Sequence, residues 1–164
     1  MSADKKLACF KAYDVRGRVP EDLDEDLAYK IGRVFVKQQG AQTVVVGRDV
    51  RLSSEGFVKA VTQGLTDAGA RVLDIGVCGT ECIYFGTSHL DADGGIMVTA
   101  SHNPMNYNGM KFVGRGSVPL SGDTGLPEIE RMILEDDLGD KPGGGTVERV
   151  DIADAYIDHL MTYV

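Results

Sequence analysis

The chain is poor in cysteine and has no long apolar run. Three cysteines in 164 residues make an odd count, and they form no CxxC pair and have no histidine at metal-ligand spacing. Neither a disulfide framework nor a zinc site is therefore predicted. We expect Cys9, Cys78 and Cys82 to be buried free thiols. No stretch approaches the roughly 20 apolar residues of a membrane-spanning helix, so none is predicted.

Cationic side chains are also scarce. Lys and Arg number 17 against 25 Asp and Glu, so the formal net charge is −8. An acidic surface argues against nucleic acid or an anionic membrane as a partner. It does not argue against a small anion, which responds to the side chains around it, and the cations of interest are Arg16, Arg48, Arg51 and Lys111. Residues 1–6 lack the apolar core of a signal peptide, which predicts a cytoplasmic protein.

Helical and strand-like apolar patterns alternate along the chain. A continuous β-branched run such as residues 43–46 is typical of a strand covered on both faces, as in parallel sheets. The alternation predicts a mixed α/β domain with a mainly parallel sheet. The predicted elements are a helix opened by Pro20 and ending near Gly40, a strand at 43–46, a helix capped by Ser53 and Ser54 and stopped at Gly69, a strand at 71–75, a short helix at 81–89, strands at 94–98 and 110–113, a helix capped by residues 123–127, a surface loop at 139–146, and a last helix whose apolar residues are Ile152, Tyr156, Leu160 and Tyr163.

Residues 99–111, Thr-Ala-Ser-His-Asn-Pro-Met-Asn-Tyr-Asn-Gly-Met-Lys, bring a nucleophile, a base and a cation together in the sequence. The strand predicted at 94–98 leaves Ser101 at its carboxyl end, where ligands bind in α/β sheets. A serine is idle as a nucleophile unless a nearby base takes its proton or a prior modification makes it reactive. His102 and Lys111 are the candidates for that base and for a neighbouring cation.

The residues taken alone leave other interpretations open. A turn serine usually hydrogen-bonds only its own backbone, and Arg48, Asp49 and Arg51 can form a structural ion-pair network around the loop or contact a substrate. A hydrolase that used Ser101 with His102 would need a third residue to orient the base and an oxyanion hole, and the chain has no G-x-S-x-G elbow. It also has no Gly-Lys-Ser or Gly-Lys-Thr and no clean GxGxxG after a strand, so nucleotide binding is excluded.

Four segments together resemble the α-D-phosphohexomutases, the enzymes that move a phosphoryl group between the 1- and 6-positions of a hexose. They are residues 10–17 (Phe-Lys-Ala-Tyr-Asp-Val-Arg-Gly), 47–51 (Gly-Arg-Asp-Val-Arg), 99–104 and 106–111, and they occur in the family's order. The wording of the last two is most similar to bacterial phosphomannomutases and phosphomannomutase/phosphoglucomutases. The resemblance covers essentially the whole chain, but only the first of the family's four domains.

This resemblance implies a three-layer α/β/α sandwich and a set of roles. In the family the working serine is phosphorylated and its phosphoryl group is exchanged through a bisphosphorylated hexose, which assigns that part to Ser101. His102 would bind the substrate or orient the loop, and Lys111 would act as a base or stabilise the phosphate. Arg16 and Tyr13 would bind the sugar phosphate. A Mg²⁺ ion would bridge the phosphoserine, and the partners would be mannose 1- and 6-phosphate, with the glucose phosphates also open.

The resemblance also predicts what surrounds this domain. Residues 1–150 would form the phosphoserine domain, and residues 151–164 would be a helix leading toward a second domain. The family's Asp-x-Asp-x-Asp metal loop belongs to that second domain. Asp91-Ala92-Asp93 precedes a strand at the wrong end of the sheet and is expected to be a turn. We expect the chain alone to be inactive as a mutase, with an autonomous, non-catalytic phosphosugar-binding module as the alternative.

Overall fold

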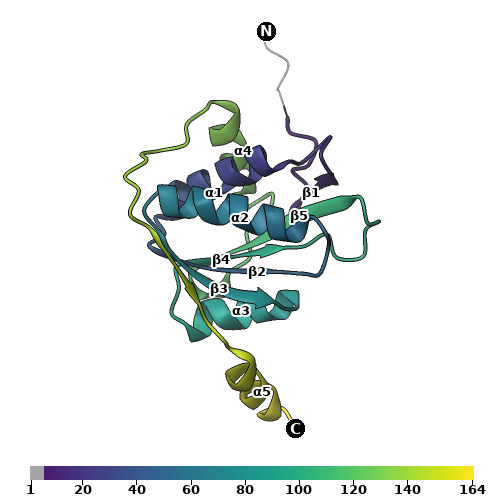
Figure 1. The fold of residues 1–164 in the computed structure, drawn as a ribbon, viewed down its shortest axis with the longest axis vertical. Coiled ribbons are helices and arrows are strands. Elements are labelled where there is room, and N and C mark those ends of the chain that lie inside the picture. Colours follow the sequence, from purple (N-terminus) through teal and green to yellow (C-terminus); the bar gives the residue numbers. More distant parts are fainter. Residues whose placement is uncertain (1–5) are drawn as a thin grey trace.

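A single mixed sheet organises the part of the chain that the computed structural model describes, residues 6–164. Its strands are joined by helices in most of the crossovers (Figure 1). The elements are β1 Val15–Arg18, α1 Glu25–Gln39, β2 Thr43–Arg48, α2 Ser54–Asp67, β3 Arg71–Val77, α3 Thr80–His89, β4 Gly94–Val98, β5 Tyr107–Gly114, a 3₁₀ turn η1 Arg115–Ser117, α4 Leu126–Leu134, β6 Thr146–Arg149 and α5 Ala153–Met161.

The sheet is mainly parallel, as the sequence predicts. Its strand order is β1-β5-β4-β2-β3-β6; β4, β2, β3 and β6 are mutually parallel, and β5 pairs antiparallel with both of its neighbours, β4 and the edge strand β1. The strand β4 is buried along its whole length, and β2 is buried at its four central residues. This burial explains why these strands read as continuous apolar runs rather than alternating ones.

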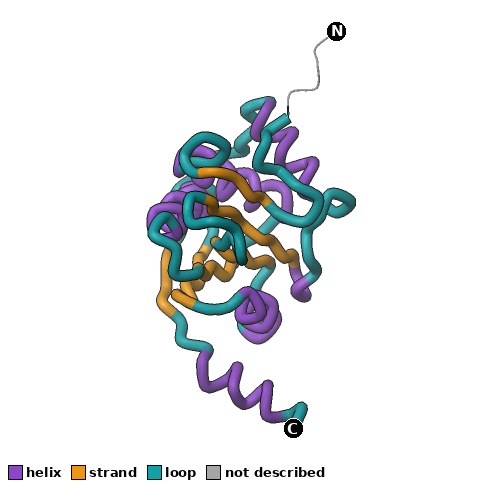
Figure 2. Tube along the Cα trace, turned by 90° about the vertical axis from the view of Figure 1, so that its right-hand side faces the viewer, coloured by secondary structure: helices purple, strands orange, loops and turns teal. Residues whose placement is uncertain are grey.

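Helices cover both faces of the sheet. The helices α1, α2 and α4 lie on one face and α3 lies on the other (Figures 1 and 2). Two separate clusters of buried side chains fill the space between the layers: the larger contains Phe35 and Phe112, whose ring centroids are 6.0 Å apart, and the smaller contains Ile83 and Met97. The three-layer α/β/α sandwich is therefore confirmed.

Two glycines let α1 and α2 approach each other closely. An added Cβ at Gly32 would lie 2.3 Å from the carbonyl oxygen of Val61, and one at Gly64 would lie 2.1 Å from that of Tyr29. Both obstacles are backbone atoms of the opposite helix, which cannot move aside as a flexible side chain can. The close packing of α1 against α2 thus requires glycine, which has no side chain, at both positions.

We expect Gly64→Ala to lower the free energy of unfolding by about 1–3 kcal/mol, the usual cost of overpacking. This loss outweighs the roughly 1 kcal/mol by which alanine is the better helix former. Gly56→Ala is the matched control, because it lies in the same helix and its Cβ would meet only the carboxylate end of the Glu25 side chain. Urea denaturation compares the two, and equal stability of both variants would contradict the prediction.

The start of α1 was predicted wrongly by a few residues, whereas those of α2 and α4 lie where the sequence placed them. Pro20 lies in a turn, and α1 begins at Glu25, because Asp24 accepts a hydrogen bond from the Leu27 N–H (2.8 Å) and caps the helix there. Ser53 occupies the cap position of α2 but makes no capping bond. The helix α4 begins at Leu126, after Gly125 in a left-handed conformation. The predicted end near Gly40 is confirmed, since Gly40 has φ of 60°.

Two strands escaped prediction, and the last helix is only partly as expected. The strand β1 overlaps a segment interpreted as a binding motif, and β6 begins at Thr146, the last residue of the predicted loop at 139–146. Ile152 is buried just before α5, and Tyr156 lies against Phe85 with ring centroids 5.3 Å apart. No residue of α5 itself is buried. None of the helices within residues 6–164 meets the length and hydropathy needed to span a bilayer.

The cysteine prediction is correct for one residue of three. All are free thiols, but only Cys9 is buried, whereas Cys78 and Cys82 are half-buried. Burial raises the pKa of the Cys9 thiol to about 11 and that of Cys78 to about 12. Because the thiolate is the reactive form, these two groups are chemically quiet at neutral pH.

Candidate active site

Ser101 lies in the turn that leaves β4 at its carboxyl end. The turn is drawn close to β5, because the Thr99 N–H donates to the carbonyl of Gly109 (2.9 Å). Gly109 has no room for a side chain there, since a Cβ would lie 2.1 Å from the Val15 carbonyl oxygen. Ser101 is exposed and has φ of 54°, a left-handed conformation that costs a non-glycine residue about 1–3 kcal/mol.

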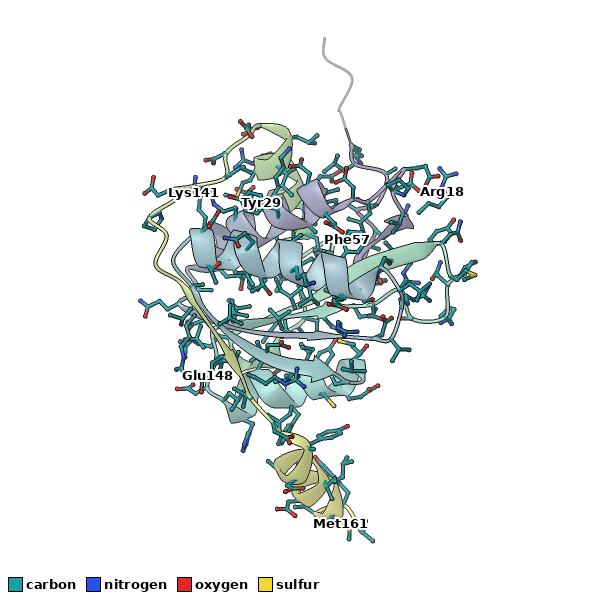
Figure 3. All side chains as sticks on the ribbon, viewed as in Figure 1. Arg18, Tyr29, Phe57, Lys141, Glu148 and Met161 are labelled. Carbon is teal, nitrogen blue, oxygen red and sulfur yellow. The ribbon has the colours of Figure 1, made fainter. Side chains whose placement is uncertain are left out.

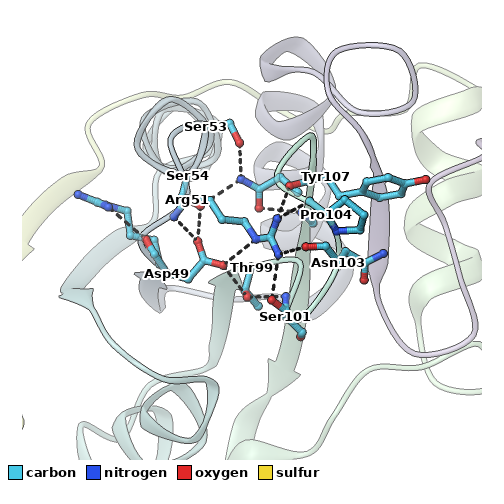
Figure 4. A network of polar contacts seen from close by, with 12 residues as sticks. Asp49, Arg51, Ser53, Ser54, Thr99, Ser101, Asn103, Pro104 and Tyr107 are labelled. Atoms are coloured by element: carbon cyan, nitrogen blue, oxygen red, sulfur yellow. Dashed lines mark hydrogen bonds and ion pairs between the residues drawn. The ribbon is translucent and has the colours of Figure 1, made fainter.

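The side chain of Arg51 clamps this turn from the neighbouring loop. Its Nη2 donates to the carbonyl oxygens of Ser101 (2.9 Å) and Asn103 (2.6 Å). Its Nη1 donates to those of Pro104 (2.7 Å) and Tyr107 (3.1 Å). Figure 4 shows the guanidinium at the centre of these four contacts. One side chain from the loop after β2 thus holds residues 99–107, here called the serine turn, at four points.

Asp49 ties the clamp to the rest of the fold. Its carboxylate lies 3.3 Å from Arg51 Nε and accepts hydrogen bonds from Ser54 Oγ (2.6 Å) and Thr99 Oγ1 (2.8 Å). Thr99 Oγ1 in turn accepts from the backbone N–H of Ser101 (2.9 Å). A continuous polar chain therefore runs from the start of α2 to the serine, as Figure 4 shows.

Asn108 fixes the far side of the same loop. Its side chain is fully buried, donates to Ser53 Oγ (2.8 Å) and Ser54 Oγ (3.0 Å), and accepts from the Gly109 N–H (2.8 Å). The two serines that were expected to cap α2 are instead used to hold this asparagine. A buried amide needs such partners, and only the tertiary structure supplies them.

A carboxylate joins the two candidate cations beside the serine turn. Asp14 Oδ2 lies 2.5 Å from Arg16 Nη2 and 3.2 Å from Lys111 Nζ. The other arm of Arg16 donates to the Asn103 side chain (2.7 Å), within the serine turn itself. The structure thus brings Arg16 and Lys111 together at the edge of the turn. Asp14 was not singled out from the sequence, although it stands in the same eight-residue segment as Arg16.

Tyr13 and His102 stand apart from this network. Tyr13 is 76% exposed, and His102 is exposed next to Ser101. Neither makes a side-chain hydrogen bond or ion pair with another residue in the range 6–164. Both side chains are free to meet a ligand, and their roles stay predictions.

An open cleft lies next to Ser101. It has a volume of about 480 Å³, within the range of small-molecule sites. Three exposed apolar side chains stand on its rim, and they are Val50, Leu52 and Met105. The polar residues that line it are Asp49, Arg51, Thr99, Ser101 and Asn103. A cavity of similar size between α3 and α5 is lined largely by aromatic rings and lies away from the serine.

The residues present do not by themselves form a metal site. Across residues 6–164 no group of three or more His, Cys, Asp or Glu side chains is arranged to hold an ion.

Asp93, in the turn before β4, has a structural part. Burial disfavours its charged form, but the N–H groups of Thr43 and Gln42 and the side chain of Arg115 outweigh this effect and hold the pKa of the carboxyl below its usual range. Asp93 is thus a structural residue at the opposite end of β4, as expected for a turn.

Comparison with known proteins places the chain in one family. Residues 8–140 match the family model described as phosphoglucomutase/phosphomannomutase, alpha/beta/alpha domain I. The chain belongs to this phosphohexomutase family and corresponds to its N-terminal domain.

Individual relatives agree with this assignment. The chain is 52% identical over 162 residues to a phosphomannomutase of Escherichia coli K12, covering 98% of this chain and 36% of that protein. It is also 52% identical to a phosphomannomutase sequence of Klebsiella pneumoniae, covering 93% of this chain and 99% of that sequence. A crystal structure from Burkholderia thailandensis, a phosphoglucomutase/phosphomannomutase family protein, superposes with a TM-score of 0.85 at 39% identity, over 95% of this chain and 36% of that one. The chain therefore spans about a third of the length of most of these relatives.

Proposed function

We propose that this chain is the phosphoserine domain of a phosphohexomutase that interconverts mannose 1-phosphate and mannose 6-phosphate. The observation that carries the proposal is the serine turn itself. Ser101 is exposed at the carboxyl end of β4, Arg51 holds its turn at four carbonyl oxygens, and Arg16 and Lys111 meet at Asp14 at the edge of the turn. The mannose assignment rests on the names of the relatives, and the glucose phosphates are the alternative substrates.

In this proposal phosphorylated Ser101 gives its phosphoryl group to the free hydroxyl of a hexose monophosphate. A new bond forms between phosphorus and the sugar oxygen as the bond to Ser101 Oγ breaks, and the hydroxyl proton passes to a base, for which His102 and Lys111 are the candidates. The resulting hexose bisphosphate then returns its other phosphoryl group to the serine. Catalysis of this kind is mainly positioning and neutralisation of charge, and Arg16 and Lys111 would supply positive charge.

Mg²⁺ is the metal that such a reaction uses to offset phosphate charge. We propose that the phosphoryl oxygens on Ser101 contribute to its coordination and that the other ligands come from outside this chain.

We also propose that residues 1–150 act as the phosphoserine domain and that residues 151–164 connect it to a second one. The absence of any buried residue within α5, which contacts the domain mainly through Phe85, supports this division, because a short helix gains most of its stability from packing against a neighbour.

The state of Ser101 provides the direct test. We expect mass spectrometry of the chain expressed with its natural sequence, and then incubated with a hexose bisphosphate and Mg²⁺ in the presence of the C-terminal part of a relative, to find one phosphoryl group. Fragmentation should place it on Ser101. Phosphorylation at Ser53, Ser117 or Ser121 instead would overturn the assignment.

A further inference from the structure

The guanidinium of Arg51 spends its hydrogen bonds inside the protein. An arginine side chain carries five N–H groups; the two Nη atoms of Arg51 make four hydrogen bonds to loop carbonyl oxygens, and its Nε lies 3.3 Å from the Asp49 carboxylate as an ion pair. Its side chain is only 13% exposed. Of the two interpretations that the sequence left open, this geometry favours the internal network over substrate contact.

The four carbonyl groups that Arg51 satisfies belong to a turn with little hydrogen bonding of its own. Within it the Asn103 N–H donates to the Ala100 carbonyl (3.1 Å) and the Tyr107 N–H to that of Pro104 (3.0 Å). Pro104 removes one donor, and the positive φ of Ser101 is unfavourable for a serine. Without Arg51 the local sequence would not keep this turn in one shape.

The clamp is itself held by rigid elements. Arg51 follows the end of β2, and its own N–H donates to Asp49 Oδ1 (3.0 Å). The same carboxylate holds Ser54 at the start of α2 and Thr99 at the end of β4. The position of the serine turn is therefore set by the ends of β2 and β4 and the start of α2. Figure 3 shows where these elements lie in the whole fold, and Figure 4 shows the network.

We infer that Arg51 is a positioning residue for phosphoryl transfer at Ser101. It acts through the backbone of the turn, holding Ser101 Oγ toward the cleft, and it does not touch the substrate. This inference rests on the proposed function. Lysine cannot replace arginine here, because an ammonium group is a compact charge with three donors and lacks the planar fork that reaches four carbonyls and a carboxylate at once.

The test compares Arg51→Lys, which keeps the charge and loses the fork, with Arg71→Lys as the matched control. Arg71 lies at the start of β3, away from the serine turn, and its exposed side chain pairs with Glu148. Activity is measured in a chimera in which this chain replaces the corresponding first part of the Escherichia coli phosphomannomutase. We expect Arg51→Lys to lower kcat about 100-fold, the scale expected for a misplaced reacting group, while KM changes less than about twofold. Arg71→Lys should resemble the wild type.

A second measurement does not depend on activity. Hydrogen exchange of the 164-residue chain, followed by mass spectrometry, should show faster exchange in residues 99–107 for Arg51→Lys and unchanged exchange in β2 and β4. If this variant unfolds, Thr99→Val serves in its place, because it keeps the side-chain shape and removes the hydroxyl that joins the Ser101 N–H to the Asp49 carboxylate. It should give the same pattern with a smaller loss of kcat.

The outcomes separate the inference from the proposed function. A wild-type chimera without mutase activity would overturn the proposed function, and the exchange measurement would then decide on Arg51 alone. An active wild type with unchanged kcat in Arg51→Lys would overturn the inference. A raised KM at constant kcat would do so as well, because it would mean that Arg51 binds the substrate.

Discussion

Replacing Ser101 by alanine is expected to abolish mutase activity in the chimera with the Escherichia coli phosphomannomutase. The rate should fall about 10⁴-fold or more, as it does when the nucleophile of a covalent mechanism is removed, because no other group can carry the phosphoryl between the two positions of the sugar. Interconversion of mannose 1-phosphate and mannose 6-phosphate measures this. The isolated chain should show no activity above the same Ser101→Ala background.

Ser117→Ala is the control for this experiment, because Ser117 shares the unusual backbone of Ser101. Their φ angles are 59° and 54°, so an alanine meets the same left-handed strain at either site. Ser117 lies at η1, where its hydroxyl contacts Ser88 and the Tyr84 carbonyl. We expect Ser117→Ala to keep the activity even if it is slightly less stable. Comparable activity in Ser101→Ala would refute the phosphoserine assignment.

Much of the fold followed from the sequence because its signals are local. The β-branched run at 43–46 and the apolar run at 94–98 became central strands, since a strand buried on both faces needs no partner-specific information to be recognised. The strand β1 escaped because it has only four residues and pairs with β5, which lies about ninety residues further along the chain. Its existence depends on that distant pairing.

The same division holds for the site. A nucleophile and two cations could be predicted from the sequence, because they lie inside the recognisable segments 10–17 and 99–111: these are Ser101, Arg16 and Lys111. Asp14 and Asn108 could not, since their importance lies in contacts with residues 97 and 54 positions away. The roles of Arg48, Asp49 and Arg51 were open for the same reason: an arginine that binds phosphate and one that clamps carbonyl groups look alike until its donors are traced.

Replacing Arg16 by alanine is expected to lower the activity strongly without abolishing it. One arm of Arg16 holds Asp14 and the other holds Asn103 of the serine turn. Its Nε is buried with no partner among residues 6–164, a cost to stability that is explained if the residue is retained for function. Losing charged hydrogen bonds of about 1.5–3 kcal/mol predicts a fall in kcat/KM of roughly 10- to 100-fold.

Two further variants show whether the loss comes from phosphate contact or from the turn. Arg16→Lys keeps the charge but not the two-armed geometry, so it should recover only part of the activity. Asn103→Ala removes the partner in the turn and leaves Arg16 paired with Asp14. If Arg16 binds the sugar phosphate, Arg16→Ala raises KM more than Asn103→Ala does. Equal effects of the two variants on KM and kcat would instead mean that Arg16, like Arg51, acts only by holding the turn.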